Sequence, residues 1–353
     1  MTRTRPRPPE PVLRPGMPVL DRGDGEVQLG TDPRWALVLT GLHEREVRWL
    51  CDVAAHRHGS LRRSAARHGV AADRRDDVLA TLARGGLVLA PARSRPEVTA
   101  VAAGGADVPA LAALLPDGDG LGTLARRAAR TVAVVGLARI GSLVAAHLAA
   151  AGVGSLLLDD DLPVQVTDLG VGTYAAADVG RRRADALRGS LAALTPRTGT
   201  GATRWRDDDP PSAVVVVADR VDRPEAFARL TGLGVPHLSV VVREADVLVG
   251  PFVLPGTSAC VACRHHQAGD DDPRWPELAR QLRGWQGVTG QETVLATTVA
   301  AVAAGQVLSH LDGTRPGLCD AVAEVRLPDA LPRLRPLDPH PACGCTAPRP
   351  VPS

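Results

Sequence analysis

The sequence contains no lysine and no asparagine, so all 41 of its basic side chains are arginines. Phe, Trp and Tyr together supply only 2% of its 353 residues. The arginines face 39 acidic residues, and a formal net charge of +2 indicates no nucleic-acid partner. No stretch approaches the ~18–20 uncharged apolar residues that a membrane helix requires, so we expect no membrane partner. The overall composition, with 44% apolar and 23% charged residues, is typical of a globular protein.

The N-terminus also lacks the features of a secretory signal. Residues 1–15 are rich in Arg and Pro and contain neither an apolar core region nor a small-residue cleavage site. We therefore expect a cytoplasmic chain. In that compartment six cysteines indicate reduced thiols or a metal site rather than a disulfide framework.

At ~100–200 residues per domain, the length predicts two domains. We expect a disordered leader over residues 1–24, a winged-helix-like α+β module over 25–92, a linker over 93–122, a main domain over 123–348 and a tail over 349–353. The module is predicted from β-prone runs and helix-length stretches at Val27–Leu29, Trp35–Leu39, Glu44–Ala55, Leu61–His68, Asp73–Arg84 and Gly86–Leu89. The linker carries one short helix near Val108–Leu115.

In the main domain, Val/Leu-rich strands alternate with helical stretches. The predicted strands are Val132–Val135, Ser155–Leu158, Ala213–Ala218 and His237–Val242, and the helices between them are Ser142–Ala151, Arg183–Leu194 and Pro224–Leu233. This alternation predicts an α/β fold with a Rossmann-like, doubly wound and mainly parallel sheet. Thr293–Leu311 is predicted to be a buried Ala/Val-rich helix that backs the sheet and forms contacts in a homodimer.

A glycine-rich turn follows the first of these strands. Gly136 and Gly141 flank Ala138 and Arg139 between that strand and the next helix. Such a turn presents backbone N–H groups and a positive helix end to a phosphate. About 20 residues further on, a strand ends in residues 159–161, which are all Asp, and a carboxylate there can accept hydrogen bonds from a ribose.

The stretch from Gly136 to Pro196 resembles the ThiF/MoeB/ubiquitin-activating-enzyme superfamily through "AAAGVGSLLLDDD", "VTDLG", "DVGRRRADAL" and "LTP". The resemblance covers residues of about 130–345. Members of that family adenylate a C-terminal carboxylate with ATP and magnesium, and many carry a four-Cys zinc site. The resemblance implies that Asp160 holds the ribose and that Gly136 and Gly141 shape the phosphate turn. It places the family's phosphate-binding Lys on Arg183 and its magnesium-binding Asp on Asp219.

The sequence departs from the family pattern at several of these positions. The family's Asn is Asp168, its motif Arg is Val171 and its Gly-Gly pair is Ala138-Arg139. Arg183 keeps the positive charge but has the geometry of a planar fork, and Arg139 lies where it could replace a lost cation. The catalytic candidates are therefore Arg139, Arg183 and Asp219, whereas Asp168 places a negative charge near a triphosphate.

Two closely spaced cysteine pairs, Cys260/Cys263 and Cys343/Cys345, lie about 80 residues apart. Two loops that each supply two thiolates form the tetrahedral site of a structural zinc, which leaves no position open for catalysis. His265 and His266 could substitute for one ligand, although adjacent histidines on a charged segment usually face solvent. Cys51 and Cys319 are expected to be structural, because neither has a context that favours a thiolate.

The pairing of a winged-helix-like module with this domain resembles the leader-peptide-binding, cyclodehydratase-associated members of the superfamily. In those proteins a precursor peptide adds a strand to the small sheet, which here implies an edge near Val27–Leu29 or Trp35–Leu39. A DNA-binding winged helix and a dimerisation module stay open as alternatives. Residues 56–58 and several nearby arginines are basic, but Asp73, Asp76 and Asp77 weaken the case for DNA.

Two functions follow from these features. In the first, the chain is an ATP-dependent adenylyltransferase that acts on the C-terminal carboxylate of a peptide or small carrier protein. In the second, it is a catalytically silent, zinc-stapled scaffold that presents a ribosomal precursor peptide to a separate modifying enzyme. A nicotinamide dehydrogenase is a third alternative, which would not explain the cysteine pairs. Trp275 and Trp285, on a long excursion after the first pair, are expected to serve packing more than peptide binding.

Overall fold

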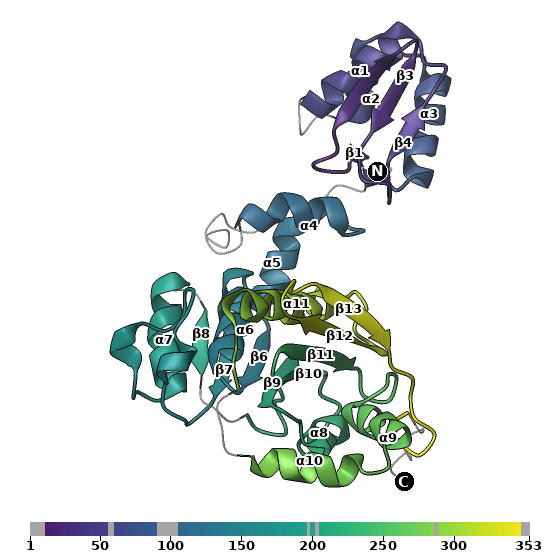
Figure 1. Ribbon diagram of the computed structural model, residues 1–353. Coiled ribbons are helices and arrows are strands. Elements are labelled where there is room, and N and C mark those ends of the chain that lie inside the picture. The colour runs from purple at the N-terminus through teal and green to yellow at the C-terminus, as the bar shows by residue number, and fades with distance from the viewer. Residues whose placement is uncertain are drawn as a thin grey trace, which may run out of the picture. The chain divides into compact units, whose positions relative to one another are not determined.

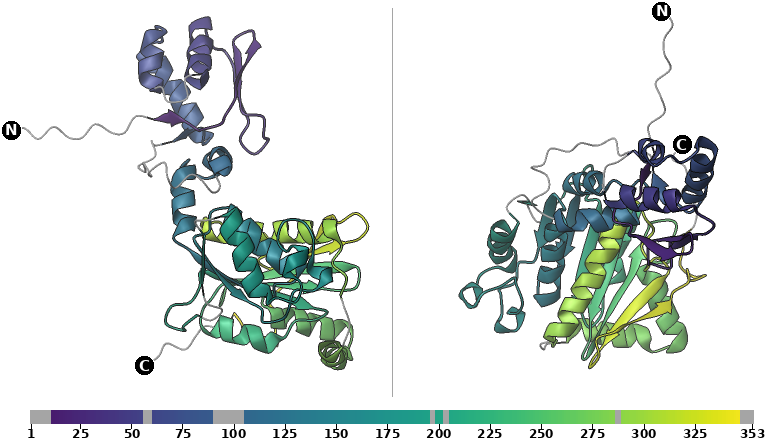
Figure 2. Two further views of the ribbon diagram at one scale, coloured as in Figure 1. Left: turned by 90° about the vertical axis from the view of Figure 1, so that its left-hand side faces the viewer. Right: turned by 90° about the horizontal axis from the view of Figure 1, so that it is seen from above.

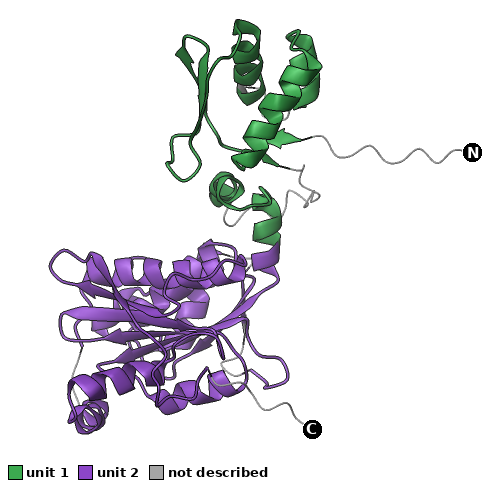
Figure 3. Ribbon diagram, turned by 90° about the vertical axis from the view of Figure 1, so that its right-hand side faces the viewer, with its two compact units in different colours: residues 1–125 green, residues 126–353 purple. Residues whose placement is uncertain are grey.

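The computed structural model describes residues 11–55, 60–89, 105–195, 198–201, 205–285 and 289–346. The chain divides into two compact units, an N-terminal unit of residues 1–125 and a C-terminal unit of residues 126–353 (Figure 3). Helix α5 (Gly120–Ala128) spans the boundary between them. Some predicted features, namely the basic residues 56–58, residues 90–104 of the module and linker, residue 196 and the tail, lie outside the described residues.

The N-terminal unit packs three helices against a small antiparallel sheet (Figure 1). The strands β2 (Val19–Gly23), β3 (Glu26–Leu29) and β4 (Leu37–Leu39) lie in that order, and the helices are α1 (Glu44–Ala55), α2 (Leu61–Arg67) and α3 (Ala72–Arg84). Trp49, which is fully buried, forms the centre of the core and donates its indole N–H to the carbonyl of Leu61 at 3.1 Å. The order of elements is that of the predicted winged-helix-like module.

Two expectations for this unit were wrong. The expected leader contains β1 (Val12–Leu13), which pairs with β5 (Val88–Leu89), and β2, whose hairpin with β3 turns at Asp24-Gly25. An Asp-Gly pair is a strong hairpin signal, because both residues tolerate the positive φ that the turn requires. The second error concerns Val27–Leu29, which lies in the central strand β3 and therefore offers no free edge. The free edges of this sheet belong to β2 and β4.

The linker is also more ordered than predicted. Residues 105–114 form a short 3₁₀ turn, η2 (Gly105–Asp107), and helix α4 (Val108–Leu114), close to the helix expected there. Arg14 fastens this segment within the N-terminal unit by donating to the carbonyl of Ala113 at 2.6 Å and to that of Gly86 at 2.9 Å.

The C-terminal unit is built on an eight-stranded sheet, which confirms the predicted α/β class. From one edge to the other the strands are β13 (Pro332–Pro336), β12 (Ala321–Arg326), β11 (Asp246–Val253), β10 (His237–Val242), β9 (Ala213–Asp219), β6 (Thr131–Val135), β7 (Ser155–Asp159) and β8 (Gly199–Gly201). The strands from β10 to β8 run parallel, and β11, β12 and β13 extend the sheet antiparallel. The sheet is therefore mainly parallel.

Helices cover both faces of this sheet, as in a doubly wound fold (Figures 1 and 2). One face carries α6 (Arg139–Ala150), α7 (Arg183–Leu194) and α11 (Thr293–Leu311), and the other carries α8 (Pro224–Gly232) and α9 (Val261–Asp271), with α10 (Trp275–Gly284) beside α9. Strand β6 shows why: Val132 and Val134 point into the first core, whereas Ala133 points into the second. Alternation of side chains along a strand feeds both faces.

The expectation that no stretch approaches the length of a membrane helix was wrong for helix α11. Within the described part of the chain it is the one helix that is long and apolar enough to cross a membrane by length and composition. Its residues Leu295, Val299 and Ala303 are fully or almost fully buried in the sheet-facing core. It therefore backs the sheet, as predicted.

Candidate functional site

The predicted phosphate turn lies at the carboxyl end of β6, where the chain enters α6. Gly136 has a φ of +81°, and a Cβ there would lie 2.3 Å from the carbonyl oxygen of Val217. A Cβ on Gly141 would lie 1.8 Å from the carbonyl oxygen of Gly136. Both glycines are therefore required by the close approach of α6 to strands β6 and β9, and the site lies where ligands bind in doubly wound folds.

Backbone donors of this turn already have acceptors within the protein. The N–H of Gly136 donates to the carbonyl of Asp159 at 3.0 Å, and the N–H of Leu137 donates to Oδ2 of Asp160 at 2.8 Å. The N–H of Ile140, in the first turn of α6, donates to the side-chain oxygen of Gln291 at 2.9 Å. Protein oxygens thus occupy donors that a phosphate would use.

Asp160 and Arg183 do come together, but with Asp168 as a third partner. The Arg183 guanidinium donates through Nε to Oδ2 of Asp168 at 2.8 Å and through Nη2 to Oδ1 at 3.1 Å. Its Nη1 donates to Oδ2 of Asp160 at 3.1 Å. All three side chains are less than a tenth exposed. The two carboxylates outnumber the guanidinium, so this ion-pair cluster of Asp160, Asp168 and Arg183 carries a net negative charge.

Short loops fix both carboxylates of the cluster. Asp168 ends the 3₁₀ turn η3 (Val166–Asp168) and accepts from the N–H of Gln165 at 2.9 Å. Asp160 accepts from the N–H of Leu162 at 2.9 Å through its other oxygen. Because backbone donors hold the carboxylates, the guanidinium is bound to a rigid acceptor set.

Arg139 lies at the start of α6 and bridges two loops. It donates through Nη1 to the carbonyl of Gln291 at 2.6 Å and through Nη2 to the carbonyl of Leu169. Its Nε is buried and has no hydrogen-bond partner among the described residues. A Cβ on Gly170 would lie only 3.1 Å from this nitrogen, so Gly170 leaves the space that the guanidinium fills.

Sequence reasoning missed two residues of this site. Gln291 lies about 150 residues from α6 in the chain and carries no motif that links it to the turn. Tyr174, the one tyrosine of the sequence, is buried and donates its hydroxyl to the carbonyl of Leu137 at 2.8 Å. Burial raises the pKa of Tyr174, so its hydroxyl stays protonated and acts as a donor. Its rarity in the chain was the available signal.

Asp219 is the last residue of β9, the strand next to β6. The residue as a whole is exposed, but burial of its carboxyl group raises the pKa of Asp219 above the ordinary value. The positive charges of Arg183 and Arg220 partly oppose that rise. Of the predicted site carboxylates, Asp219 is thus more open to solvent than Asp160.

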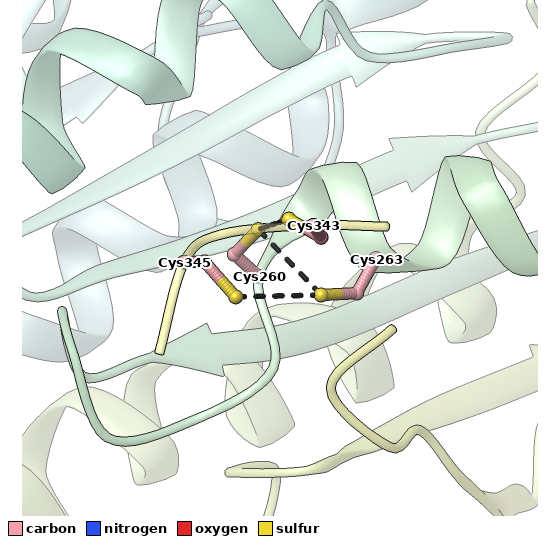
Figure 4. Close-up of side chains that lie close together, drawn as sticks. All are labelled: Cys260, Cys263, Cys343 and Cys345. Atoms are coloured by element: carbon pink, nitrogen blue, oxygen red, sulfur yellow. Dashed lines mark hydrogen bonds between the residues drawn. The ribbon is translucent and has the colours of Figure 1, made fainter. Parts of the chain in front are cut away.

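The four cysteines converge as their spacing predicted. Cys260 and Cys263 lie at the start of α9, Cys343 and Cys345 lie near the C-terminal end of the described chain, and their sulfur atoms lie within 4.8 Å of one another (Figure 4). Three of the separations between sulfur atoms are 3.4, 3.5 and 3.9 Å. Tetrahedral zinc with Zn–S bonds of ~2.3 Å requires sulfur separations of ~3.8 Å, so the donor set fits a metal.

His265 does not face solvent, contrary to expectation. It forms a 2.7 Å contact through Nε2 with Oδ1 of Asp222, and its Nδ1 accepts the indole N–H of Trp275 at 3.1 Å. Asp222 also accepts from Ser239 at 2.7 Å and from Arg264. This buried network fastens α9 and α10 to the sheet, which is the packing role expected of Trp275. His266 is exposed as expected.

Comparisons with known proteins agree with the fold. The family model described as "ThiF family" matches residues 120–345. Escherichia coli MccB crystallised with ATP superposes with a TM-score of 0.70 at 13% identity and covers 95% of this chain and 99% of its own. The structure of Escherichia coli MccB with AMPCPP and MccA gives a TM-score of 0.72 at 13% identity, covering 96% and 99%. PaaA gives 0.68 at 16% identity, covering 91% and 98%. A search of curated proteins finds no significant match.

Proposed function

The chain belongs to the ThiF family, and from this membership and its site geometry we propose that it is a peptide-binding scaffold of peptide modification whose nucleotide site is closed. In this function it binds a precursor peptide and presents it to a separate modifying enzyme. The adenylyltransferase-like fold is kept as a framework. The observation that carries the proposal is the ion-pair cluster of Asp160, Asp168 and Arg183.

The cluster opposes nucleotide binding through its charge. Moving Arg183 to a phosphate would leave Asp160 and Asp168 buried with their negative charges uncompensated. Breaking a buried ion pair costs ~3–5 kcal/mol. Each ~1.4 kcal/mol is tenfold in affinity, so this cost alone weakens ATP binding by roughly a factor of 100 to 4,000. The departures from the family pattern at positions 168 and 183 therefore compensate each other.

The turn itself supports the same proposal. A phosphate at the start of α6 would have to displace the side-chain oxygen of Gln291 from the N–H of Ile140. It would also meet Asp160, which already accepts from the N–H of Leu137. The carboxylate of Asp160 therefore competes with the phosphate for the N–H of Leu137. The site is filled by the chain's own acceptors.

The peptide partner follows from the N-terminal unit and from the neighbours. MccB has been crystallised with MccA, and PaaA shares the fold. We assign the peptide to the free edge of β4, where it would add a strand through backbone hydrogen bonds. Trp35 lies just before β4, and the Arg34 guanidinium lies 4.4 Å from its ring centroid. This stack gives the edge a platform for side chains of the peptide.

Adenylation is the second candidate function. It is favoured by the tight turn that Gly136 and Gly141 form and by Asp219, whose carboxylate could hold magnesium. In that function Asp160 would hold the ribose, and Arg139 and Arg183 would contact phosphates. The ion-pair cluster would have to open in every catalytic cycle, which is why we place this function second.

We further propose that Cys260, Cys263, Cys343 and Cys345 hold a structural zinc ion. Four thiolates are a soft donor set, and tetrahedral sites of this kind select zinc among the common divalent ions. The N–H of His340 donates to the sulfur of Cys263 at 3.3 Å, the kind of contact that steadies a thiolate ligand. The ion would fasten the C-terminal segment to α9.

A double substitution tests the closed site. Asp168→Asn with Arg183→Lys restores both family residue types and removes the surplus carboxylate. We expect it to gain binding of magnesium ATP in calorimetry by at least tenfold over the parent. The matched control is Asp185→Asn with Arg188→Lys, an exposed ion pair on the same helix. Tight ATP binding by the parent, with pyrophosphate exchange, would support adenylation instead.

A further inference from the structure

A cavity lies next to Asp219, at the carboxyl end of β9. It has a volume of about 290 Å³ and lies between the end of that strand, the first half of α8 and the C-terminal end of α10. Asp219, Arg220, Arg223, Arg283 and Trp285 line it. The ion-pair cluster described above contributes none of the lining residues, so this cavity is separate from the closed phosphate turn.

The charge of this cavity is positive. Three guanidinium groups face two carboxylates, and Asp222 is already neutralised by Arg264 and hydrogen-bonded to Ser239 and His265. At the rim, Arg283 lies 3.9 Å from Glu225 and Arg220 lies 3.5 Å from Glu244. Those two glutamates are almost three-quarters exposed, and ion pairs in solvent contribute little. Among the described residues that line the cavity, Asp219 is the carboxylate that Arg264 does not neutralise.

Arg283 supplies a donor that the described protein does not satisfy. Its Nε is buried, and among the described residues no hydrogen-bond acceptor reaches it. Buried polar groups are nearly always paired, so a buried N–H beside a cavity is open to an acceptor that the described residues do not supply. Arg283 lies in the last turn of α10, and the hydrogen bond between Trp275 and His265 holds that helix in place.

Trp285 and Arg220 form the other wall. Trp285 is 64% exposed, which is unusual for the largest side chain in a sequence so poor in aromatic residues. The Arg220 guanidinium lies 5.6 Å from its ring centroid. Arg220 has a φ of +65°, a conformation that a non-glycine residue adopts at a cost and that collects at functional sites. The backbone thus places a guanidinium against an aromatic face at the mouth of the cavity.

We propose that this cavity binds a carboxylate of the peptide partner, with Arg283 as the main contact and Trp285 as the platform for the adjoining peptide plane. The inference rests on the proposed function, in which the partner is a peptide. A guanidinium fork matches the two oxygens of a carboxylate. Asp219 disfavours a doubly charged phosphate more than a singly charged carboxylate. The cavity has room for an amino-acid side chain.

The test uses the full chain labelled with ¹⁵N at its five tryptophan indoles. The signal of Trp285 is assigned from Trp285→Phe. The probes are acetyl-Gly-Asp-Gly-amide, which carries a side-chain carboxylate, acetyl-Gly-Asn-Gly with a free C-terminus, the uncharged acetyl-Gly-Asn-Gly-amide, and inorganic phosphate. We expect one or both carboxylate peptides to shift the Trp285 signal saturably, and the pair identifies the source of the carboxylate. The uncharged peptide should leave the signal unchanged.

Arg283→Gln should weaken this binding about tenfold, the cost of losing one charge-assisted contact of ~1.4 kcal/mol. Arg280→Gln is the matched control, because Arg280 lies on the same helix and pairs with Glu277 in solvent. An equal shift with the uncharged peptide, tighter binding of phosphate, or no shift with any probe would overturn the inference. Peptide binding at β4 is measured independently. If the peptide binds β4 but the cavity gives any of these contrary results, only the cavity inference fails and the proposed function stands.

Discussion

Arg183 donates two parallel hydrogen bonds to the carboxylate of Asp168, from Nε at 2.8 Å and from Nη2 at 3.1 Å. At these positions the resembled family has a lysine and an asparagine, which bind phosphate separately. Here Arg183 and Asp168 form a buried ion pair instead. The pair is compatible with the fold, and it leaves the guanidinium of Arg183 bound to a protein carboxylate. In the proposed function, this single pair of residues accounts for both the preserved framework and the closed nucleotide site.

Removal of this cation should destabilise the C-terminal unit strongly. Arg183→Gln leaves Asp160 and Asp168 buried without a counter-charge, so we expect a loss of about 3–5 kcal/mol in the free energy of unfolding. Urea denaturation followed by circular dichroism measures it. Arg188→Gln, on the same helix but in an exposed ion pair, should cost less than about 1 kcal/mol. Equal losses for the two variants would contradict a buried cluster.

The cysteine cluster predicts one metal ion per chain. Elemental analysis of purified protein should find zinc, and Cys263→Ser should lose it because three thiolates bind zinc far less tightly. Chelation of the parent should lower its melting temperature to that of the variant. Cys51→Ser, which changes a cysteine of the N-terminal unit that is not one of the four clustered cysteines, should keep the metal. Full metal content in Cys263→Ser would contradict the assignment.

Fully buried His237 predicts a loss of stability in mild acid. Burial lowers its pKa from 6.5 to about 4, while its Nδ1 lies 2.8 Å from the carbonyl of Val235. The unfolded chain therefore binds a proton that the folded chain excludes, and stability present above pH 6.5 falls as the pH drops toward 4. Between pH 7 and pH 5 the expected loss is about 2 kcal/mol.

The control for this prediction is His237→Leu, which removes the titrating group from the buried position. Unfolding free energies of the parent and the variant are compared at pH 7 and pH 5. From pH 7 to pH 5 the free energy of unfolding should fall more for the parent than for the variant. Parallel pH dependences would show that His237 does not titrate as a buried group.

The free edge of β4 predicts the position of the bound peptide. A peptide selected from a displayed random library against the full chain should slow hydrogen exchange of the β4 amides, because a new strand covers them. Val38→Pro should weaken binding by about tenfold or more, since proline disrupts strand pairing. Leu20→Pro on the opposite edge strand β2 is the matched control. Protection confined to β2 would place the peptide on the other edge.

Strongly periodic segments were predictable from the sequence. The bounds of α7, β10 and α11 match the predicted ranges Arg183–Leu194, His237–Val242 and Thr293–Leu311, because long apolar patterns leave few alternative structures. Strands β1 and β2 were missed because each is short and lies in a Pro/Arg-rich stretch. Strand β13 is exposed along its whole length, so no apolar pattern marks it.

The candidate site was predictable only where spacing along the chain determines it. The spacing of the two cysteine pairs predicts that they cluster, since each pair fits one tight loop. The contact of Gln291 with the start of α6 joins segments 151 residues apart, and no local pattern encodes it. The partner of Arg183 depended on the shape of the loop that ends at Asp168, which propensities do not specify. Sequence reasoning therefore found residues of the site but not the ion pair between Arg183 and Asp168.

The central claim is that the nucleotide site is closed, and calorimetry of the zinc-loaded parent with magnesium ATP tests it most directly. We predict no saturable binding at millimolar ATP and no pyrophosphate exchange, in a protein whose circular dichroism and metal content show that it is folded. Saturable binding that Asp160→Ala abolishes, with exchange on addition of a peptide, would contradict the account and identify the chain as an adenylating enzyme.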